Sequence, residues 1–190
     1  MGAPPLRRAV AALAVLANIA MWWRAFAWLP SLPERFPIHF NAAGEPDGWS
    51  TSRAAWFLLP AIATVLLLAL FGASRLVGGL ARSSPALINI PRKDVFLRLS
   101  PDGRAAATAP AQAYLGVVLG LVQLLFLYIL EGTGRVAVEQ APMLPSWPVF
   151  VFLGIVFATL PVFLIATIRA VDARAAEEGV LSGGGAPRAR

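Results

Sequence analysis

Five polar residues that could take part in chemistry lie close together, between the first two apolar segments of the chain. They are one histidine, one amide and three carboxylates: Glu34, His39, Asn41, Glu45 and Asp47. A catalytic zinc ion needs about three protein ligands and a water, for which His39, Asp47 and Glu45 are weak candidates. A hard cation held by Asp47, Glu45 and backbone carbonyls is an open alternative. The pattern lacks the spacing of a specific ligand motif, so neither a metal nor a cofactor is predicted.

The same polar residues allow two further interpretations. They could hydrogen-bond the backbone of their own loop and hold its turns, or they could recognise a ligand or partner. The sequence contains one histidine, no cysteine and none of the hydrolase, zinc-protease, P-loop or dinucleotide motifs. No catalytic residue is therefore predicted, and a non-enzymatic role is favoured. The alternative is a membrane-embedded, metal-dependent enzyme acting on a lipid or envelope substrate.

Prolines and glycines give this loop a restricted backbone. Each proline fixes its own φ and favours extended geometry at the residue before it, which predicts an extended arm over residues 29–40. The sequence then predicts an Asx turn over 41–44 with Gly44 left-handed, and a second tight turn over 45–48. A prefolded loop over residues 30–53 should present a ligand-binding or partner-binding site. Its predicted residues are His39, Asn41, Gly44, Pro46, Asp47 and Trp49.

Composition places this loop in an integral membrane protein. Of the 190 residues, 58% are hydrophobic and 14% are charged, and the mean hydropathy is +0.69, which is typical of a membrane protein. The fold class predicted is all-α with four transmembrane helices, because four apolar windows are long enough to cross a bilayer. A cleaved signal peptide is the alternative for the first window, but its length and its tryptophans favour retention. The predicted spans cover residues 10–29, 54–77, 111–130 and 148–168.

The basic residues predict the orientation of these spans. If the N-terminus is cytoplasmic, twelve of the sixteen Lys and Arg residues lie inside and four lie outside. This asymmetry predicts that both termini are cytoplasmic. All six tryptophans then lie at the outer ends of the spans or in the outer loops, where indoles prefer the interface. The net charge of +6 is spread over short segments beside the membrane, so lipid rather than nucleic acid is the predicted partner.

Several polar and small residues lie within the spans. Asn18 and Gln123 are expected to find hydrogen-bond partners on neighbouring helices, and Arg24 to reach the outer headgroups or an acid of the outer loop. Pro60 is expected to kink the second helix. Gly116 and Gly120 allow close helix approach, either inside the bundle or in a homo-oligomer.

The segment between the second and third spans is the second informative region. It mixes basic and apolar residues, which predicts a short piece lying on the cytoplasmic membrane surface. Ser100, Pro101 and Asp102 predict a helix start, and Pro110 predicts a break before the third span. Residues 1–170 are predicted to form the membrane domain, and residues 171–190 a disordered cytoplasmic tail.

The stretch Leu32-Pro-Glu-Arg-Phe-Pro-Ile-His-Phe-Asn-Ala-Ala-Gly-Glu-Pro-Asp-Gly-Trp49 resembles the signature of the bacterial membrane family of domain of unknown function 1648. Members include the amino-terminal part of the immunity protein SdpI. The signature with its two helices spans about residues 10–77. The inner stretch Asn89-Ile-Pro-Arg-Lys-Asp94 also resembles a segment of small members, in which Asn often stands where this chain has Arg92. The inner residues singled out by this likeness are Asn89, Pro91 and Lys93.

The resemblance implies a multi-pass protein of the bacterial plasma membrane. It is consistent with a recognition, immunity-like or signalling module that uses the outer loop, and it supplies no reaction. The expected partners are the lipid bilayer and a peptide or membrane protein.

Overall fold

Four long helices form the body of the molecule. The structure is a computed structural model that describes residues 3–181, with side chains from Arg8 onward. Four of its helices are long and apolar enough to cross a membrane, the number that was predicted. The structure does not test the predicted orientation of the termini. The helices are α1 (Ala3–Trp28), α3 (Leu58–Ser83), α6 (Ala109–Ala137) and α7 (Trp147–Glu177).

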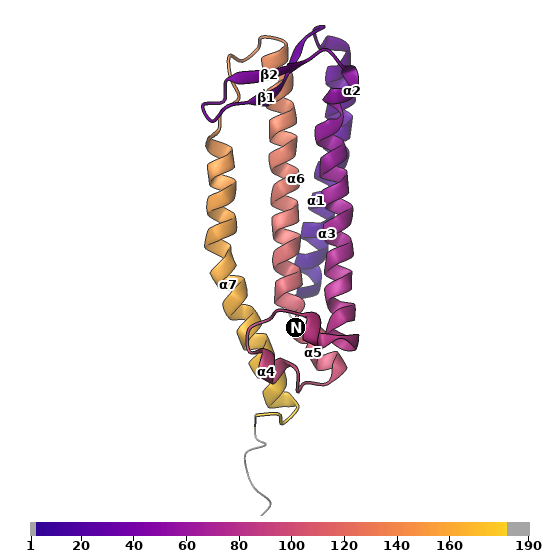
Figure 1. Cartoon of the computed structure of the whole chain (residues 1–190), viewed down its shortest axis with the longest axis vertical. Coiled ribbons are helices and arrows are strands. Elements are labelled where there is room, and N and C mark those ends of the chain that lie inside the picture. Colours follow the sequence, from indigo (N-terminus) through magenta and orange to yellow (C-terminus); the bar gives the residue numbers. More distant parts are fainter. Residues whose placement is uncertain (1–2, 182–190) are drawn as a thin grey trace, which may run out of the picture.

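The four helices are not packed equally. Helices α1, α3 and α6 contact one another, whereas α7 packs along α6 and lies at the side of the bundle (Figure 1). No residue in the most apolar window of α7 is buried inside the protein. In a membrane this helix therefore presents most of its surface to lipid.

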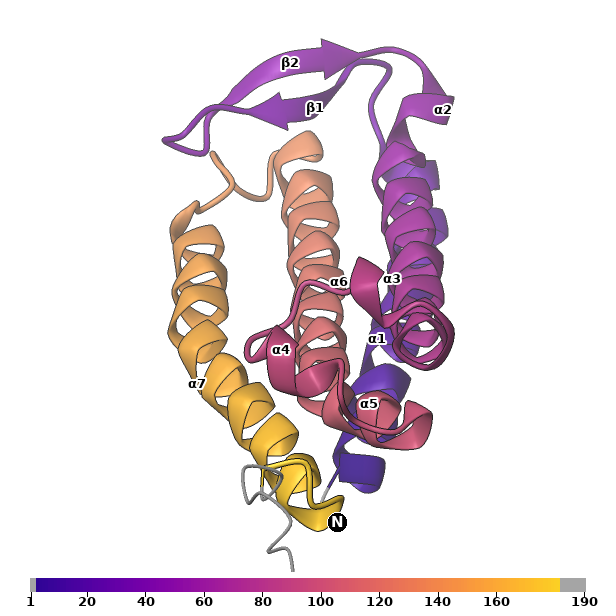
Figure 2. The same ribbon diagram turned by 60° about the horizontal axis from the view of Figure 1, so that its bottom comes forward.

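The two ends of the bundle have different architectures (Figures 1 and 2). One end, called the hairpin end below, carries a two-stranded antiparallel sheet and the α6–α7 loop. The opposite end, called the basic end, carries short helices that lie between α3 and α7. The hairpin end contains η1 (Leu29–Ser31), β1 (Phe36–Phe40), β2 (Pro46–Ser50) and α2 (Arg53–Trp56). The basic end contains η2 (Pro85–Leu87), α4 (Lys93–Phe96) and α5 (Pro101–Ala107).

A buried polar network joins the three packed helices. Asn18 Nδ2 of α1 donates to Gln123 Oε1 of α6 at 3.0 Å, and Gln123 Nε2 donates to the Ala63 carbonyl of α3 at 2.8 Å. Thr64 Oγ1 lies 3.2 Å from Asn18 Oδ1 and accepts a hydrogen bond from Trp22 Nε1 at 2.9 Å. The prediction that Asn18 and Gln123 bond across helices is confirmed. Each amide satisfies a group that would otherwise be unpaired in hydrocarbon.

Prolines set the breaks near the ends of the helices. The kink predicted within the second helix is instead a break at Phe57, between α2 and α3, which places Pro60 in the first turn of α3. The first turn tolerates a proline because its missing N–H would have no intrahelical partner there. The predicted break before the third span is confirmed, because α5 ends at Ala107 and α6 begins at Ala109.

The segment at the basic end is packed inside the protein, which corrects the prediction that it lies on the membrane surface. Ile90, Phe96 and Leu99 are buried against residues of α3, α5 and α7. Leu97 of the same segment is exposed. The apolar side chains of this segment find protein partners because α7 continues past the membrane span and provides a surface for them.

Helix α7 also corrects the start of the predicted tail. It continues to Glu177, and Val171 and Ala175 are buried against the basic end. Gly179, with φ +70°, closes the helix as the Val180 N–H donates to the Ala175 carbonyl at 2.8 Å. Burial of these apolar residues keeps residues 171–181 ordered, and residues 182–190 of the predicted tail lie outside the described residues.

The two glycines predicted to allow close approach lie on α6. A side chain at Gly120 would meet Val10 of α1 at 3.5 Å, and one at Gly116 would meet the same residue at 3.9 Å. They therefore lie beside α1 within the bundle, and a homo-oligomer through these glycines stays a prediction.

Candidate functional site

The hairpin is anchored to the bundle by its first strand. Phe36 is fully buried among residues of α1, α3 and α6. Its ring meets Trp56 edge to face, with the ring centroids 5.9 Å apart, and Trp56 Nε1 donates to the Ala25 carbonyl at 2.8 Å. Burying two aromatic side chains at one junction contributes several kcal/mol, of the order of 1.5–3 each. This end of the hairpin is therefore fixed relative to the helices.

The turn of the hairpin is organised by Asn41. Its Oδ1 accepts hydrogen bonds from the N–H groups of Ala43 at 2.9 Å and Glu45 at 3.0 Å. Its Nδ2 donates to Glu45 Oε2 at 3.1 Å. The Asx turn and the left-handed Gly44, with φ +85°, are both confirmed.

The turn is docked on the loop between α6 and α7. The Leu144 N–H donates to the Gly44 carbonyl at 2.8 Å. Gly44 is buried, and a Cβ at this position would lie 1.9 Å from the Leu144 carbonyl oxygen. The hairpin is therefore held at both of its ends, by Phe36 at one and by Gly44 at the other.

The second tight turn predicted over residues 45–48 is wrong, because Pro46 begins β2. The first three residues of the predicted extended arm also differ, since η1 covers Leu29–Ser31. The strands pair with irregular register around His39, and Phe40 lies opposite Pro46. Both strands of a two-stranded sheet have a free edge, so Pro37 and Pro46 fit without breaking a ladder.

The remaining predicted site residues lie on the exposed surface of the hairpin. His39 Nδ1 and Asp47 Oδ1 are 2.5 Å apart, and these side chains are 71% and 46% exposed. Trp49 is 44% exposed, and the Arg35 guanidinium lies 5.3 Å from its ring centroid. Ile38 is also exposed. The hairpin thus exposes an aromatic ring, an aliphatic side chain and charged groups.

The metal candidates do not converge in the part of the chain that the structure describes. No three His, Cys, Asp or Glu side chains among residues 3–181 are grouped so that they could hold a metal ion. His39 and Asp47 contact each other, while the Glu45 carboxylate accepts from Asn41. The arrangement offers two ligands rather than the three that a catalytic zinc site needs.

Comparison with known proteins bears on this same region. Residues 16–64 match the family model described as Domain of unknown function (DUF1648). This segment is therefore similar to the DUF1648 family. The match confirms the predicted family, while the likeness to SdpI stays a prediction. No curated protein matches the chain, and no solved structure matches it.

The DUF1648 segment contains most of the polar network as well as the hairpin. Asn18, Trp22 and Thr64 lie inside the matched residues, and their partner Gln123 lies outside them. The segment therefore depends on α6, which buries its amides and supports its hairpin.

The inner residues predicted beside the DUF1648 segment lie at the basic end. Lys93 Nζ donates to the Ala86 carbonyl at 2.8 Å, Asn89 is exposed and Pro91 is half-buried. Arg92 has φ +58°, a left-handed conformation in which asparagine is several-fold enriched. Arg92 Nη2 also lies 3.3 Å from Asp172 Oδ1 of α7.

Arg24 was predicted to reach the outer headgroups or an acid of the outer loop, and the acid that it contacts lies on a helix instead. Arg24 of α1 forms a bidentate pair with Glu131 of α6, with N···O distances of 2.8 and 2.9 Å. Trp28 Nε1 donates to the same carboxylate at 3.0 Å. Glu131 directly follows the apolar residues of the third predicted span, at the same side of the membrane as Arg24. This position is the one feature of the sequence that indicates the contact.

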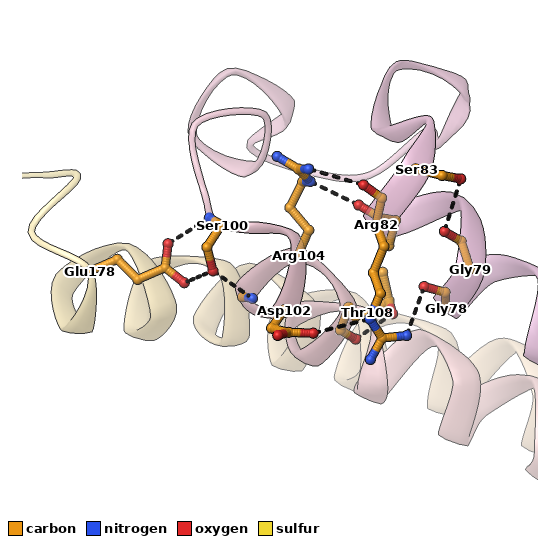
Figure 3. A network of polar contacts seen from close by, with 12 residues as sticks. Gly78, Gly79, Arg82, Ser83, Ser100, Asp102, Arg104, Thr108 and Glu178 are labelled. Atoms are coloured by element: carbon orange, nitrogen blue, oxygen red, sulfur yellow. Dashed lines mark hydrogen bonds and ion pairs between the residues drawn. The ribbon is translucent and has the colours of Figure 1, made fainter.

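An unpredicted network fixes the basic end (Figure 3). Arg104 of α5 donates to the Ala81 and Arg82 carbonyls at the end of α3 and to the Leu99 carbonyl, at 2.8, 3.2 and 2.7 Å. Glu178 accepts hydrogen bonds from the Ser100 N–H at 2.6 Å and from Ser100 Oγ at 2.7 Å. Ser100 Oγ in turn caps α5, as predicted, by accepting from the Gly103 N–H at 3.0 Å.

The Glu178 contact predicts a pH dependence of stability. The Ser100 N–H and hydroxyl donate to this carboxylate and hold its pKa below the ordinary value of 4.5. Because the pKa of this carboxyl is lower in the folded state, the contact stabilises the protein at pH values above the ordinary pKa. That stabilisation is lost as the pH falls through the lowered pKa. We expect the thermal midpoint of the wild type to fall more than that of Glu178→Gln between about pH 6 and about pH 3.

The matched control is the neighbouring carboxylate Glu177, which contacts Arg174 on its own helix. The Glu177→Gln variant should keep the acid dependence of the wild type. An equal acid response in the Glu178→Gln variant and the wild type would show that Glu178 does not link the ends of α5 and α7.

Proposed function

We propose that this multi-pass membrane protein recognises a peptide or a membrane-protein partner on the outer side of the bacterial plasma membrane. The exposed surface of the β1–β2 hairpin is the recognition site. The supporting observation is that the hairpin is fixed by Phe36 and Gly44 while His39, Asp47 and Trp49 remain exposed. A surface that is ordered before binding loses less conformational entropy when its partner arrives.

The exposed polar pair contributes little to holding the hairpin together. Asn41 organises the turn, whereas His39 and Asp47 are paired with each other across the strands. Exposed ion pairs stabilise proteins by about 0–1 kcal/mol. A pair with so small a structural contribution is available for contact with a partner.

The chemistry of the surface favours a peptide or protein segment as the occupant. Trp49 with Arg35 and exposed Ile38 offer apolar and cation–π contact, and His39 and Asp47 offer a donor and an acceptor. Aromatic residues and arginine are enriched at protein interfaces, where rigid rings bury much area at low entropic cost.

Photocrosslinking tests this proposal. A photoreactive amino acid at position 49 in the full chain, expressed in its host membrane, should give one discrete adduct on gels. The double variant His39→Ala/Asp47→Ala should lose most of that adduct, roughly tenfold or more, with a thermal midpoint close to the wild type. The control position is Trp147, which lies at the same end in α7 and is 65% exposed.

The adduct from position 147 should differ from that of position 49 and should not respond to the double variant. An absent adduct at position 49, or one that the double variant leaves unchanged, would overturn the proposal. A double variant that unfolds, with its midpoint lowered by many degrees, would instead show that the pair is structural.

The metal-dependent enzyme is the alternative, with His39 and Asp47 as the two candidate ligands that lie in contact with each other. It predicts bound metal in detergent-purified protein at near one equivalent, and loss of that metal in His39→Ala. Metal content measured by mass spectrometry in both proteins distinguishes this candidate from recognition, which requires none.

A further inference from the structure

A cavity at the basic end lies between α1, α3, α5 and α6. Its volume is about 650 Å³, within the range of about 300–1,000 Å³ common for small-molecule sites. The lining changes along its length from arginine to apolar side chains. The residues used below are Arg8, Arg75 and Arg82 on the polar side, and Leu70, Phe71 and Leu119 on the apolar side.

The charge of the cavity favours an anion. Arg82 Nε is 3.1 Å from Asp102 Oδ1, so this cation is already paired at an exposed position (Figure 3). Arg8 and Arg75 make no hydrogen bond or ion pair with another residue in the described part of the chain. Three arginines and one aspartate therefore leave two positive charges uncompensated around one cavity.

Arg75 is exposed, and it lies in a helix that is long and apolar enough to span a membrane. It lies eight residues before the end of α3 at Ser83, which at 1.5 Å per residue is about 12 Å along the helix. Ionisable side chains within membrane spans almost always pair with another group or face a polar cavity. A phosphate group in the cavity would supply the missing partner to Arg75 and, from the neighbouring helix, to Arg8.

The length of the cavity distinguishes a lipid from a free anion. From Arg82 to Leu70 it follows α3 for twelve residues, about 18 Å. The apolar side ends on the buried cluster of Ala14, Leu67 and Leu119, against which Leu70 and Phe71 pack. A free phosphate would leave this apolar surface uncovered, whereas an acyl chain would cover it.

We propose that this cavity binds one anionic phospholipid. Its phosphate is held by Arg75 and Arg8, and the first part of one acyl chain lies against Leu70, Phe71 and Leu119. Basic pockets between transmembrane helices on the cytoplasmic side suit anionic headgroups, because cationic side chains and lipid phosphates meet there. This site is separate from the hairpin and does not depend on the function proposed for it.

Native mass spectrometry of the full chain in nonionic detergent tests this site. The protein is titrated with phosphatidylglycerol, with phosphatidylcholine of the same acyl chains, and with inorganic phosphate. We expect one phosphatidylglycerol bound about tenfold more tightly than phosphatidylcholine, which corresponds to one charge-assisted contact of about 1.4 kcal/mol. Inorganic phosphate should leave the phosphatidylglycerol titration unchanged.

Variants on two helices distinguish lipid binding in the cavity from lipid binding elsewhere on the basic end. Arg75→Gln and Arg8→Gln should each remove most of the preference for phosphatidylglycerol. Arg98→Gln, at the same end but outside the cavity lining, should keep it. Thermal midpoints in lipid-free detergent identify a variant that does not fold. If one cavity variant does not fold, the lipid preference of the other cavity variant tests the site.

Three results would overturn the proposal. One is equal binding of the two lipids by the wild type, and another is an equal loss in Arg98→Gln. The third is competition by inorganic phosphate at the concentration of the lipid, which would indicate a free-anion site instead of a lipid site.

Discussion

Replacing Gly44 with alanine is expected to release the tip of the hairpin from the rest of the protein. The residue has φ +85°, and its new Cβ would lie 1.9 Å from the Leu144 carbonyl oxygen, a backbone atom that cannot rotate away. A left-handed non-glycine residue costs of the order of 1–3 kcal/mol, and the overlap adds to it. We expect the free energy of unfolding to fall by about 2–4 kcal/mol.

Two measurements check this prediction. Unfolding in mixed detergent micelles with increasing dodecyl sulfate gives the loss of stability. Trypsin cleavage after Arg35 gives the local opening of the hairpin, which should become at least about tenfold faster. The control is Ala42→Ser, at an exposed position of the same turn, which should behave as the wild type.

A second substitution separates the two causes of this effect. Asparagine adopts left-handed φ values more readily than alanine, but it carries the same Cβ. If contact with Leu144 holds the tip, Gly44→Asn should be nearly as destabilised as Gly44→Ala. Recovery of wild-type stability in Gly44→Asn would show that the turn conformation matters and the docking does not.

Replacing Gln123 with leucine is expected to weaken the contact between all three packed helices. Gln123 is fully buried, and leucine has a similar size but leaves Asn18 Nδ2 and the Ala63 carbonyl without this partner. Leaving a buried polar group unsatisfied costs about 1–3 kcal/mol in water-soluble proteins. Hydrogen bonds between membrane helices contribute less free energy on average. We therefore expect Gln123→Leu to lower the free energy of unfolding by about 1–2 kcal/mol.

The double variant with Asn18→Leu tests whether the two amides act as a pair. Removing both partners should cost less than the two single losses added together, because no amide is then left unpaired. The free energies come from the same dodecyl sulfate titration. Additive losses, with no coupling between the positions, would contradict a direct Asn18–Gln123 hydrogen bond.

The sequence predicted the parts of the fold that local chemistry determines. Four long apolar windows require helices that satisfy their own backbone in lipid. The Asn41 turn, the left-handed Gly44 and the Ser100 cap each follow from the hydrogen-bonding ability or φ preference of one residue. Asn18 and Gln123 could be predicted to bond across helices because a buried amide in hydrocarbon has few alternatives.

Most errors of prediction involve contacts between separate segments, whereas those at Leu29–Ser31 and Pro60 are local. Prolines at positions 37 and 46 suggested an arm and a turn, because nothing local shows that two strands will pair with free edges. The segment with Ile90, Phe96 and Leu99 was predicted to face lipid, because the extension of α7 that buries it is more than 70 residues away. Contacts between Arg24 and Glu131, or Ser100 and Glu178, are set by how the helices pack and not by sequence spacing.

Both proposals depend on one orientation, with the hairpin outside the cell and the basic cavity inside. The chain contains no cysteine, so single cysteines introduced at exposed positions report on topology without background. Ala42→Cys lies at the hairpin turn and Ala86→Cys at the basic end, and both positions are exposed. A membrane-impermeant maleimide applied to intact spheroplasts should label Ala42→Cys, and should label Ala86→Cys only after permeabilisation. Labelling of Ala86→Cys but not Ala42→Cys in intact spheroplasts would contradict the account.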